Sequence, residues 1–128
     1  MEEKNIESVL KLEHCVFDEI TFRRNGFKTD NEAEFEFAVN IANRDDHEYI
    51  VMILVKGEKK DEYELELRLS GYFSVDERVE EKEEESLIKY NAVAIMLPYM
   101  RSEISLLTAQ PETESEVLPI INVFKAME

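Results

Sequence analysis

Four stretches of the chain show the alternation of apolar and polar residues that is typical of β-strands. Residues 32–42 and 63–75 alternate cleanly, which predicts strands with one buried and one solvated face. Residues 10–22 alternate imperfectly and run long for one flat strand, so we expect a bend or a bulge there. Residues 49–55 are apolar at both parities, so both faces of this strand need cover. Turn-forming residues separate the four stretches at 25–26, 43–46 and 57–61.

A helical spacing of apolar residues replaces the alternation over residues 87–107. Pro98 interrupts this segment and lacks an N–H group, so we expect either a kink or a helix that begins near Pro98. The preceding residues 76–86 are strongly acidic, which is typical of either a solvated loop or the first turn of a helix. Four strands followed by a helix predict a single α+β domain over residues 1–128. We expect a four-stranded antiparallel sheet with the main helix packed on one face.

The composition narrows the classes of protein to which the chain can belong. The 128 residues carry a formal net charge of -15, so nucleic acid would be repelled and we exclude it as an unaided partner. The acidic surface either only maintains solubility or also steers the protein toward a basic partner. The single cysteine, Cys15, excludes an internal disulfide and fits a reducing compartment. The polar first residues and the lack of an apolar run of about 18 residues predict a cytoplasmic protein without membrane insertion.

Candidate groups for catalysis or metal binding are sparse. The three glycines have no phosphate-binding spacing. His14 and His47 lie in different predicted elements without the spacing of a metal site, and we interpret both as ordinary surface histidines. Cys15 follows His14 directly, but neighbouring residues of a strand point to opposite faces, so the two side chains do not form a nucleophile pair. We therefore expect no enzyme activity, no metal and no cofactor.

Three short motifs follow one another in the C-terminal half of the chain. They are Ser70-Gly71-Tyr72-Phe73, Leu97-Pro98-Tyr99-Met100-Arg101 and Leu118-Pro119-Ile120-Ile121-Asn122. Their order resembles the SecB family of protein-export chaperones. The resemblance implies structural roles for Gly71, Phe73, Pro98, Tyr99, Arg101 and Asn122. For Tyr99 we expect a buried ring with a bonded hydroxyl, and for Arg101 an acidic partner near the sheet.

The resemblance also implies a function, that of an ATP-independent holdase for unfolded precursor proteins destined for export. In the SecB family, unfolded clients occupy grooves between sheet and helix. The second face of residues 49–55 supplies an apolar stripe that needs a partner, and methionine adapts to varied partners. The candidate client-binding residues are Ile50, Met52, Leu54, Tyr72 and Met96. The alternative interpretation is a subunit interface without a client.

The apolar stripe of the helical segment is wider than one sheet face requires. It therefore predicts a contact between protomers at Met100, Ile104 and Leu107. We expect a symmetric homo-oligomer, a homodimer at least and a homotetramer by analogy with the family. The alternative is that Met96, Met100 and Leu107 belong to the core of a single chain.

Acidic residues of two predicted strands share the outward parity. The candidates for partner docking are Glu34, Glu64 and Glu66, which form one acidic face if their strands join one sheet. SecB proteins dock the SecA motor on such a face, so the resemblance implies SecA as a partner. The alternative is a face that is only solvated.

Two other functions fit the same residues. A divergent SecB-like protein is expected to hold an antitoxin instead of export precursors. A protein of another class, an acidic inhibitor that mimics the charge of nucleic acid, would also explain the net charge. The response to salt separates these two, because a charge mimic loses its partner steeply as salt rises and an apolar holdase does not.

Overall fold

The computed structural model describes residues 9–117 of the chain. The strands are β1 (Leu10–Arg24), β2 (Ala33–Asp45), β3 (Glu48–Lys59) and β4 (Tyr63–Val75). The helical run that follows consists of α2 (Glu81–Leu87), the π-helical η1 (Ile88–Ala92) and α3 (Val93–Thr108). None of these helices is long and apolar enough to cross a membrane.

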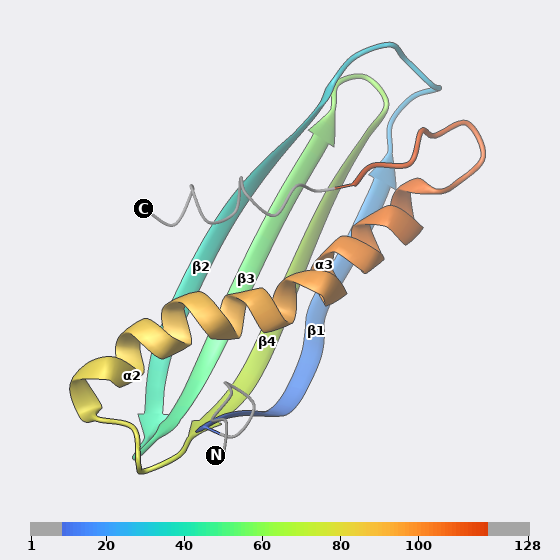
Figure 1. The fold of residues 1–128 in the computed structure, drawn as a ribbon. Coiled ribbons are helices and arrows are strands. Elements are labelled where there is room, and N and C mark those ends of the chain that lie inside the picture. The colour runs from blue at the N-terminus through green and yellow to red at the C-terminus, as the bar shows by residue number, and fades with distance from the viewer. Residues whose placement is uncertain (1–8, 118–128) are drawn as a thin grey trace, which may run out of the picture.

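The strands lie in the order β1-β4-β3-β2, and each neighbouring pair is antiparallel. The helical run crosses one face of this sheet at an angle to the strands, with α2 near the end of β2 and α3 passing over β4 toward β1 (Figure 1). We call this the helix face and the opposite side the outer face. The predicted α+β fold, an antiparallel sheet with the helix on one face, is confirmed.

The core lies between the helix face and the helical run. Helix residues at steps of four point to the sheet and are buried, namely Ile88, Ala92, Met96, Met100, Ile104 and Thr108. Gly71 of β4 lies beneath Met96, because a Cβ atom at this glycine would stand 2.7 Å from Met96 Sδ. The missing side chain therefore lets the helix approach the sheet closely.

β1 is irregular, as its imperfect alternation predicts. Its register with β4 shifts between Leu12 and His14 and again between Phe17 and Glu19. Each shift changes the parity of the residues that follow, so apolar residues of both parities pack against the core. They are Leu10, Leu12, Cys15, Phe17 and Phe22.

β3 extends beyond its predicted end. The expected turn at residues 57–61 is wrong for the first three positions, which continue the strand to Lys59. Gly57 lies inside the strand because the ring of Phe35 occupies the space of a side chain there, with Cε1 2.6 Å from an added Cβ atom. The chain reverses just after Lys59, where Asp61 has a left-handed backbone with φ of 63°.

The helical run begins earlier than Pro98. The expectation of a helix that begins near Pro98 is wrong, since this proline lies inside α3. Pro98 and Ala94 are both exposed, so the Ala94 carbonyl that loses its partner at the proline is open to water. The acidic residues 81–86 belong to α2, where carboxylates in the first turn suit the helix dipole.

Candidate functional site

The outer face of the sheet carries an apolar area across three strands. Cross-strand pairing sets its residues in rows, which are Ala42-Ile50-Tyr72, Asn40-Met52-Ser70 and Ala38-Leu54-Arg68. We call Ile50, Met52, Leu54 and Tyr72, together with the small Ala38 and Ala42, the apolar strip. Four of the five predicted client-binding residues therefore lie together, and each of the four is half-buried.

A hollow of about 500 Å³ lies in the apolar strip, with Met52, Leu54 and Ala38 among its lining residues. The polar groups at its border have partners within the chain. Ser70 Oγ donates a hydrogen bond to the Asp18 carboxylate. Arg68 Nε lies 3.1 Å from Glu19 Oε1 and 3.3 Å from Glu66 Oε2. The hollow therefore offers an apolar floor with few unmatched charges, which suits apolar side chains of a ligand.

Aromatic and cationic groups border the other end of the strip. The ring of His14 meets the edge of Tyr72 at a centroid distance of 6.2 Å. The guanidinium of Arg44 lies over the same tyrosine, 5.7 Å from the ring centroid. Tyr72 is thus held between two side chains, which limits its rotamers and keeps its ring beside Ile50.

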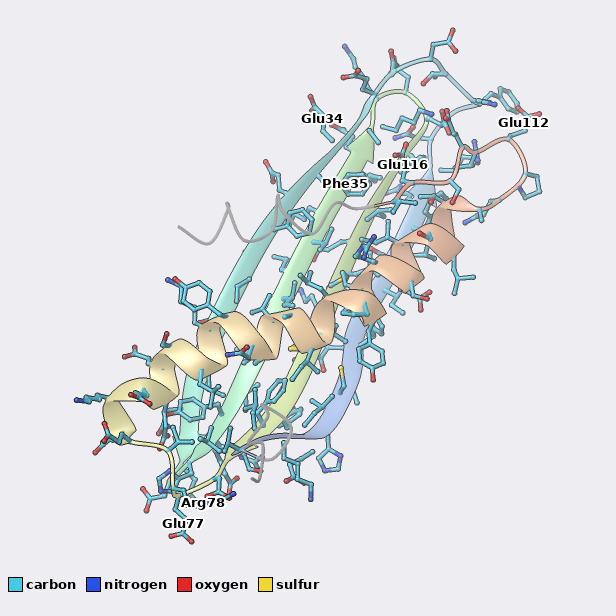
Figure 2. All side chains as sticks on the ribbon, in the orientation of Figure 1. Glu34, Phe35, Glu77, Arg78, Glu112 and Glu116 are labelled. Carbon is cyan, nitrogen blue, oxygen red and sulfur yellow. The ribbon has the colours of Figure 1, made fainter. Side chains whose placement is uncertain are left out.

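The outer face becomes acidic toward the β3–β4 turn. Here the rows are Glu36-Lys56-Glu66 and Glu34-Glu58-Glu64. A second hollow of about 610 Å³ is lined by all five of these glutamates against one lysine and one arginine, Lys56 and Arg23. We call this the acidic end. Glu34 lies at the far end of the sheet from Glu77 and Arg78, which precede α2 (Figure 2).

The three acidic docking candidates lie on this one face. Glu34 and Glu64 flank Glu58 in a single row, and Glu66 lies in the next row. Glu34 and Glu64 are exposed, whereas Glu66 is half-buried beside Arg68. The structure thus brings the three glutamates together, and their role in docking stays a prediction.

Two assignments on the helix are wrong. Met96, predicted to contact clients, is 0% exposed and packs above Gly71. Met100 and Ile104, predicted to contact another protomer, are also fully buried in the core of the single chain. Leu107 is half-buried at the margin of this core. The stripe of residues at steps of four faces the sheet, so these side chains are not available to a partner.

The residues of the three sequence motifs have different surroundings. Gly71 and Phe73 lie in the core, whereas Pro98 is exposed. Tyr99 is 51% exposed, so the expected buried ring is wrong. Arg101 is half-buried, and its acidic partner stays a prediction. The last motif, with Asn122, lies outside the described residues.

The outward side of the helices carries apolar residues that the sequence interpretation did not assign to an interface. Tyr99 and Leu106 are 51% and 66% exposed, and Ile95 is half-buried. Residues 95, 99, 102 and 106 follow steps of four, three and four, which is the spacing of one helix face. This spacing indicates from the sequence that a second stripe exists, but it does not say which of the two stripes faces the sheet.

A buried polar cluster beside the β3–β4 turn was also missed. Lys59 and Glu62 are 2% and 0% exposed, and Lys59 Nζ lies 3.4 Å from Glu62 Oε1. The backbone N–H of Thr29 donates to the same oxygen at 2.7 Å. Burial acts to raise the pKa of Glu62, but the bonds from Thr29 and Lys59 outweigh it and hold the pKa below its usual value. Burial, together with the charges of Glu116 and Glu62, raises the pKa of the neighbouring Tyr63 to about 12.

His14 and Cys15, the candidates for catalysis in β1, have different surroundings, because His14 contacts Tyr72 and Cys15 packs against the core. Within residues 9–117, no group of three or more His, Cys, Asp or Glu side chains is placed to hold a metal ion. Burial raises the pKa of the Cys15 thiol, which disfavours the reactive thiolate. His47 contacts Glu84 of α2, far along the chain from His14.

Comparison with known proteins identifies the fold. No family model and no curated protein matches the chain. Among solved structures, the chain is similar to a SecB-like chaperone of Mycobacterium tuberculosis in complex with a ChAD peptide from the HigA1 antitoxin. That match has 12% sequence identity and a TM-score of 0.72, and covers 90% of this chain and 92% of that chain. A protein of unknown function from Streptococcus agalactiae matches with 14% identity and a TM-score of 0.55, over 87% of this chain and 97% of that chain. The chain therefore has the fold of a SecB-like chaperone.

Proposed function

We propose that the protein is an ATP-independent holdase that binds unfolded segments of client polypeptides on its apolar strip. The observation that carries the proposal is the strip itself. In a SecB-like fold, Met52, Leu54 and their neighbours leave an apolar hollow of about 500 Å³ on the outer face. An apolar area of this kind on an otherwise acidic surface supports a role in binding a partner.

The geometry of the strip suits an extended chain. Its rows follow every second residue of β3, so they are spaced by about 7 Å, the repeat of side chains on one side of an extended polypeptide. Binding would gain about 25 cal/mol per Å² of apolar surface buried. Part of this gain is offset by the entropy lost when an unfolded segment becomes ordered. Such a balance favours reversible holding without nucleotide.

The kind of client follows from two different observations. The similar chaperone of Mycobacterium tuberculosis was solved with a peptide from an antitoxin, which supports a client of that class. The acidic end, with Glu34, Glu64 and Glu66, supports the alternative in which export precursors pass to the SecA motor. Both are cytoplasmic roles, and we propose the antitoxin-type client first because a complex of that kind exists for a protein of the same fold.

The proposal is tested by the suppression of aggregation. Purified protein without nucleotide is expected to reduce light scattering of a chemically unfolded client. A Met52→Ser, Leu54→Ser variant should lose this effect. The matched control, Lys56→Ser with Glu58→Ser, changes the next two outward positions of the same strand and should keep it. If wild-type protein at several-fold excess leaves scattering unchanged for several clients, the holdase proposal is wrong.

A further inference from the structure

Few side chains of α2 contact the rest of the chain, and they include Glu84 and Leu87, which packs against the core. Of its seven residues, only Glu84 is buried, with 3% of its side chain exposed. Glu84 Oε2 lies 2.6 Å from His47 Nδ1, and Tyr49 donates its hydroxyl hydrogen to Glu84 Oε1 at 2.8 Å. The contact joins the helix to the β2–β3 turn and to the start of β3.

α2 has little stability of its own. It is the N-terminal end of the helical run, most of its side chains are exposed, and helix ends fray readily. Its N-cap residue, Glu80, makes no side-chain capping bond. The next segment, η1, is π-helical, and such segments interrupt the regular ladder of helical hydrogen bonds. The docking of α2 therefore depends on Glu84 more than on helix propensity.

His47 is held in a fixed position beneath α2. Its backbone is left-handed, with φ of 61°, and its carbonyl accepts a hydrogen bond of 2.7 Å from Val75 N–H. Its side chain is 40% exposed, so protons exchange freely with water. The imidazole is thus presented to Glu84 by the backbone of two strands and still responds to the pH of the solution.

The charges around this contact all favour a protonated imidazole. The hydrogen bond with Glu84 raises the pKa of His47, burial lowers it, and the charges of Glu84, Asp46 and Glu77 raise it further, with a net rise. Burial raises the pKa of Tyr49, and so do its hydrogen bond to Glu84 and the charges of Glu84 and Glu85. The hydrogen bond with the Asn43 side chain lowers this pKa, but the net change is a rise. Tyr49 therefore stays a neutral donor while His47 titrates.

We propose that His47, Tyr49 and Glu84 form a pH-dependent latch, which holds α2 on the sheet when His47 is protonated and loosens it when His47 is neutral. The attraction is present below the ordinary histidine pKa of about 6.5 and is lost as pH rises through the higher value of the folded state. Loosening would change a groove of about 390 Å³ beside α2, which Val79, Leu87 and Tyr90 help to line. The latch does not depend on the proposed holdase function.

Amide hydrogen exchange of α2 tests the latch. Protection of residues 81–87, corrected for intrinsic exchange, should be greater at about pH 6 than at about pH 8, whereas that of α3 should not change. The change should have the same midpoint as the ring titration of His47 followed by NMR. His47→Asn removes the charged partner of Glu84, so it should lower protection at about pH 6 roughly ten-fold. Asparagine tolerates a left-handed backbone, so the substitution should not add backbone strain that would itself lower protection.

Two further variants complete the test. His14→Asn, which removes the other histidine, should leave the exchange of α2 unchanged. Tyr49→Phe should lower protection at both pH values and retain their ratio. The proposal is wrong if exchange of α2 in the wild-type protein is independent of pH, or if its midpoint differs from the titration of His47. It is equally wrong if the pH dependence persists in His47→Asn.

Discussion

Met96 of α3 packs on the helix face of the sheet, and Met52 of β3 lies on the outer face. Truncation of each tests which of the two faces belongs to the core and which is open to a client. Met96 is 0% exposed between α3 and β4, whereas Met52 is half-buried in the apolar strip. Truncation of a buried methionine to alanine costs about 2–5 kcal/mol, because apolar contacts are lost and a cavity remains. We expect that cost for Met96→Ala and about 1 kcal/mol or less for Met52→Ala.

The close contact between Gly71 and Met96 predicts a second change in the free energy of unfolding. In Gly71→Ala, the new methyl would stand 2.7 Å from Met96 Sδ and 2.8 Å from Phe73 Cε2. Overpacking costs about 1–3 kcal/mol, offset by about 0.4–1 kcal/mol from the reduced entropy of the unfolded chain. We expect a net loss of about 1–2 kcal/mol. In the double variant with Met96→Ala, the methyl enters the vacated space, so the total loss should be smaller than the sum by about 1 kcal/mol.

Urea unfolding followed by circular dichroism measures these free energies, provided that the m-value stays constant. Client holding is measured in parallel under conditions where each variant is folded. We expect folded Met96→Ala to hold clients and Met52→Ala to hold them less well. The opposite result, normal stability with lost holding in Met96→Ala, would show that Met96 contacts clients and that its place in the core is wrong.

Four other experiments give independent tests. Lys59→Met leaves the Glu62 carboxylate buried without its cation and should lower the free energy of unfolding, measured by thermal unfolding, by about 3–5 kcal/mol. Adding Glu62→Leu to this variant should restore much of the loss. The pKa of Glu62 is lowered in the folded state, so its ionised carboxylate stabilises the fold above the ordinary pKa of about 4.3. This stabilisation is lost as pH falls from there through the lower pKa of the folded state. The free energy of unfolding measured against pH in the acid range checks this. Leu106→Asp should lower the oligomeric state in light scattering without unfolding the chain, and a 15.0 kDa species for wild-type protein would refute self-association. Reversal of the three acidic docking candidates to lysine should leave stability nearly unchanged but weaken salt-sensitive SecA binding, and equal binding by both proteins would refute docking there.

The strands could be predicted from sequence because their pattern is local. β4 and most of β2 alternate, so the face of each residue there follows from its parity. The turn predicted at residues 43–46 is wrong for its first three positions, because β2 continues to Asp45 with a register shift after Asn43. β1 could be predicted only as irregular, since the positions of its two register shifts depend on β4. The end of β3 was misplaced because Gly57 is a turn residue by type, and only the ring of Phe35 on the neighbouring strand explains its place inside the sheet.

The helix faces could not be assigned by the same reasoning. Apolar residues surround much of α3, and the sequence does not state which side meets the sheet. In the structure the side of α3 that carries Met100 faces the sheet and is buried, whereas Leu106 is exposed. The contact of His47 with Glu84 joins residues 37 positions apart. Each resembles a surface residue when it is considered alone, so only the tertiary structure pairs them.

The π-helical η1 has a consequence for how the chain tolerates insertion and deletion. A π turn accommodates one residue more than an α-helical turn. Deleting one residue between Ile88 and Ala92 would turn this π turn into a regular α-helical turn with nearly the same angular advance, so α2 would keep its orientation relative to α3. A deletion within the regular part of α3 would instead rotate α2 by about 100° and turn Glu84 away from His47 and Tyr49. Homologues that lack one residue of η1 should therefore still be able to keep the glutamate, whereas homologues that lack one residue of α3 should have a different residue at the sheet-facing position of α2.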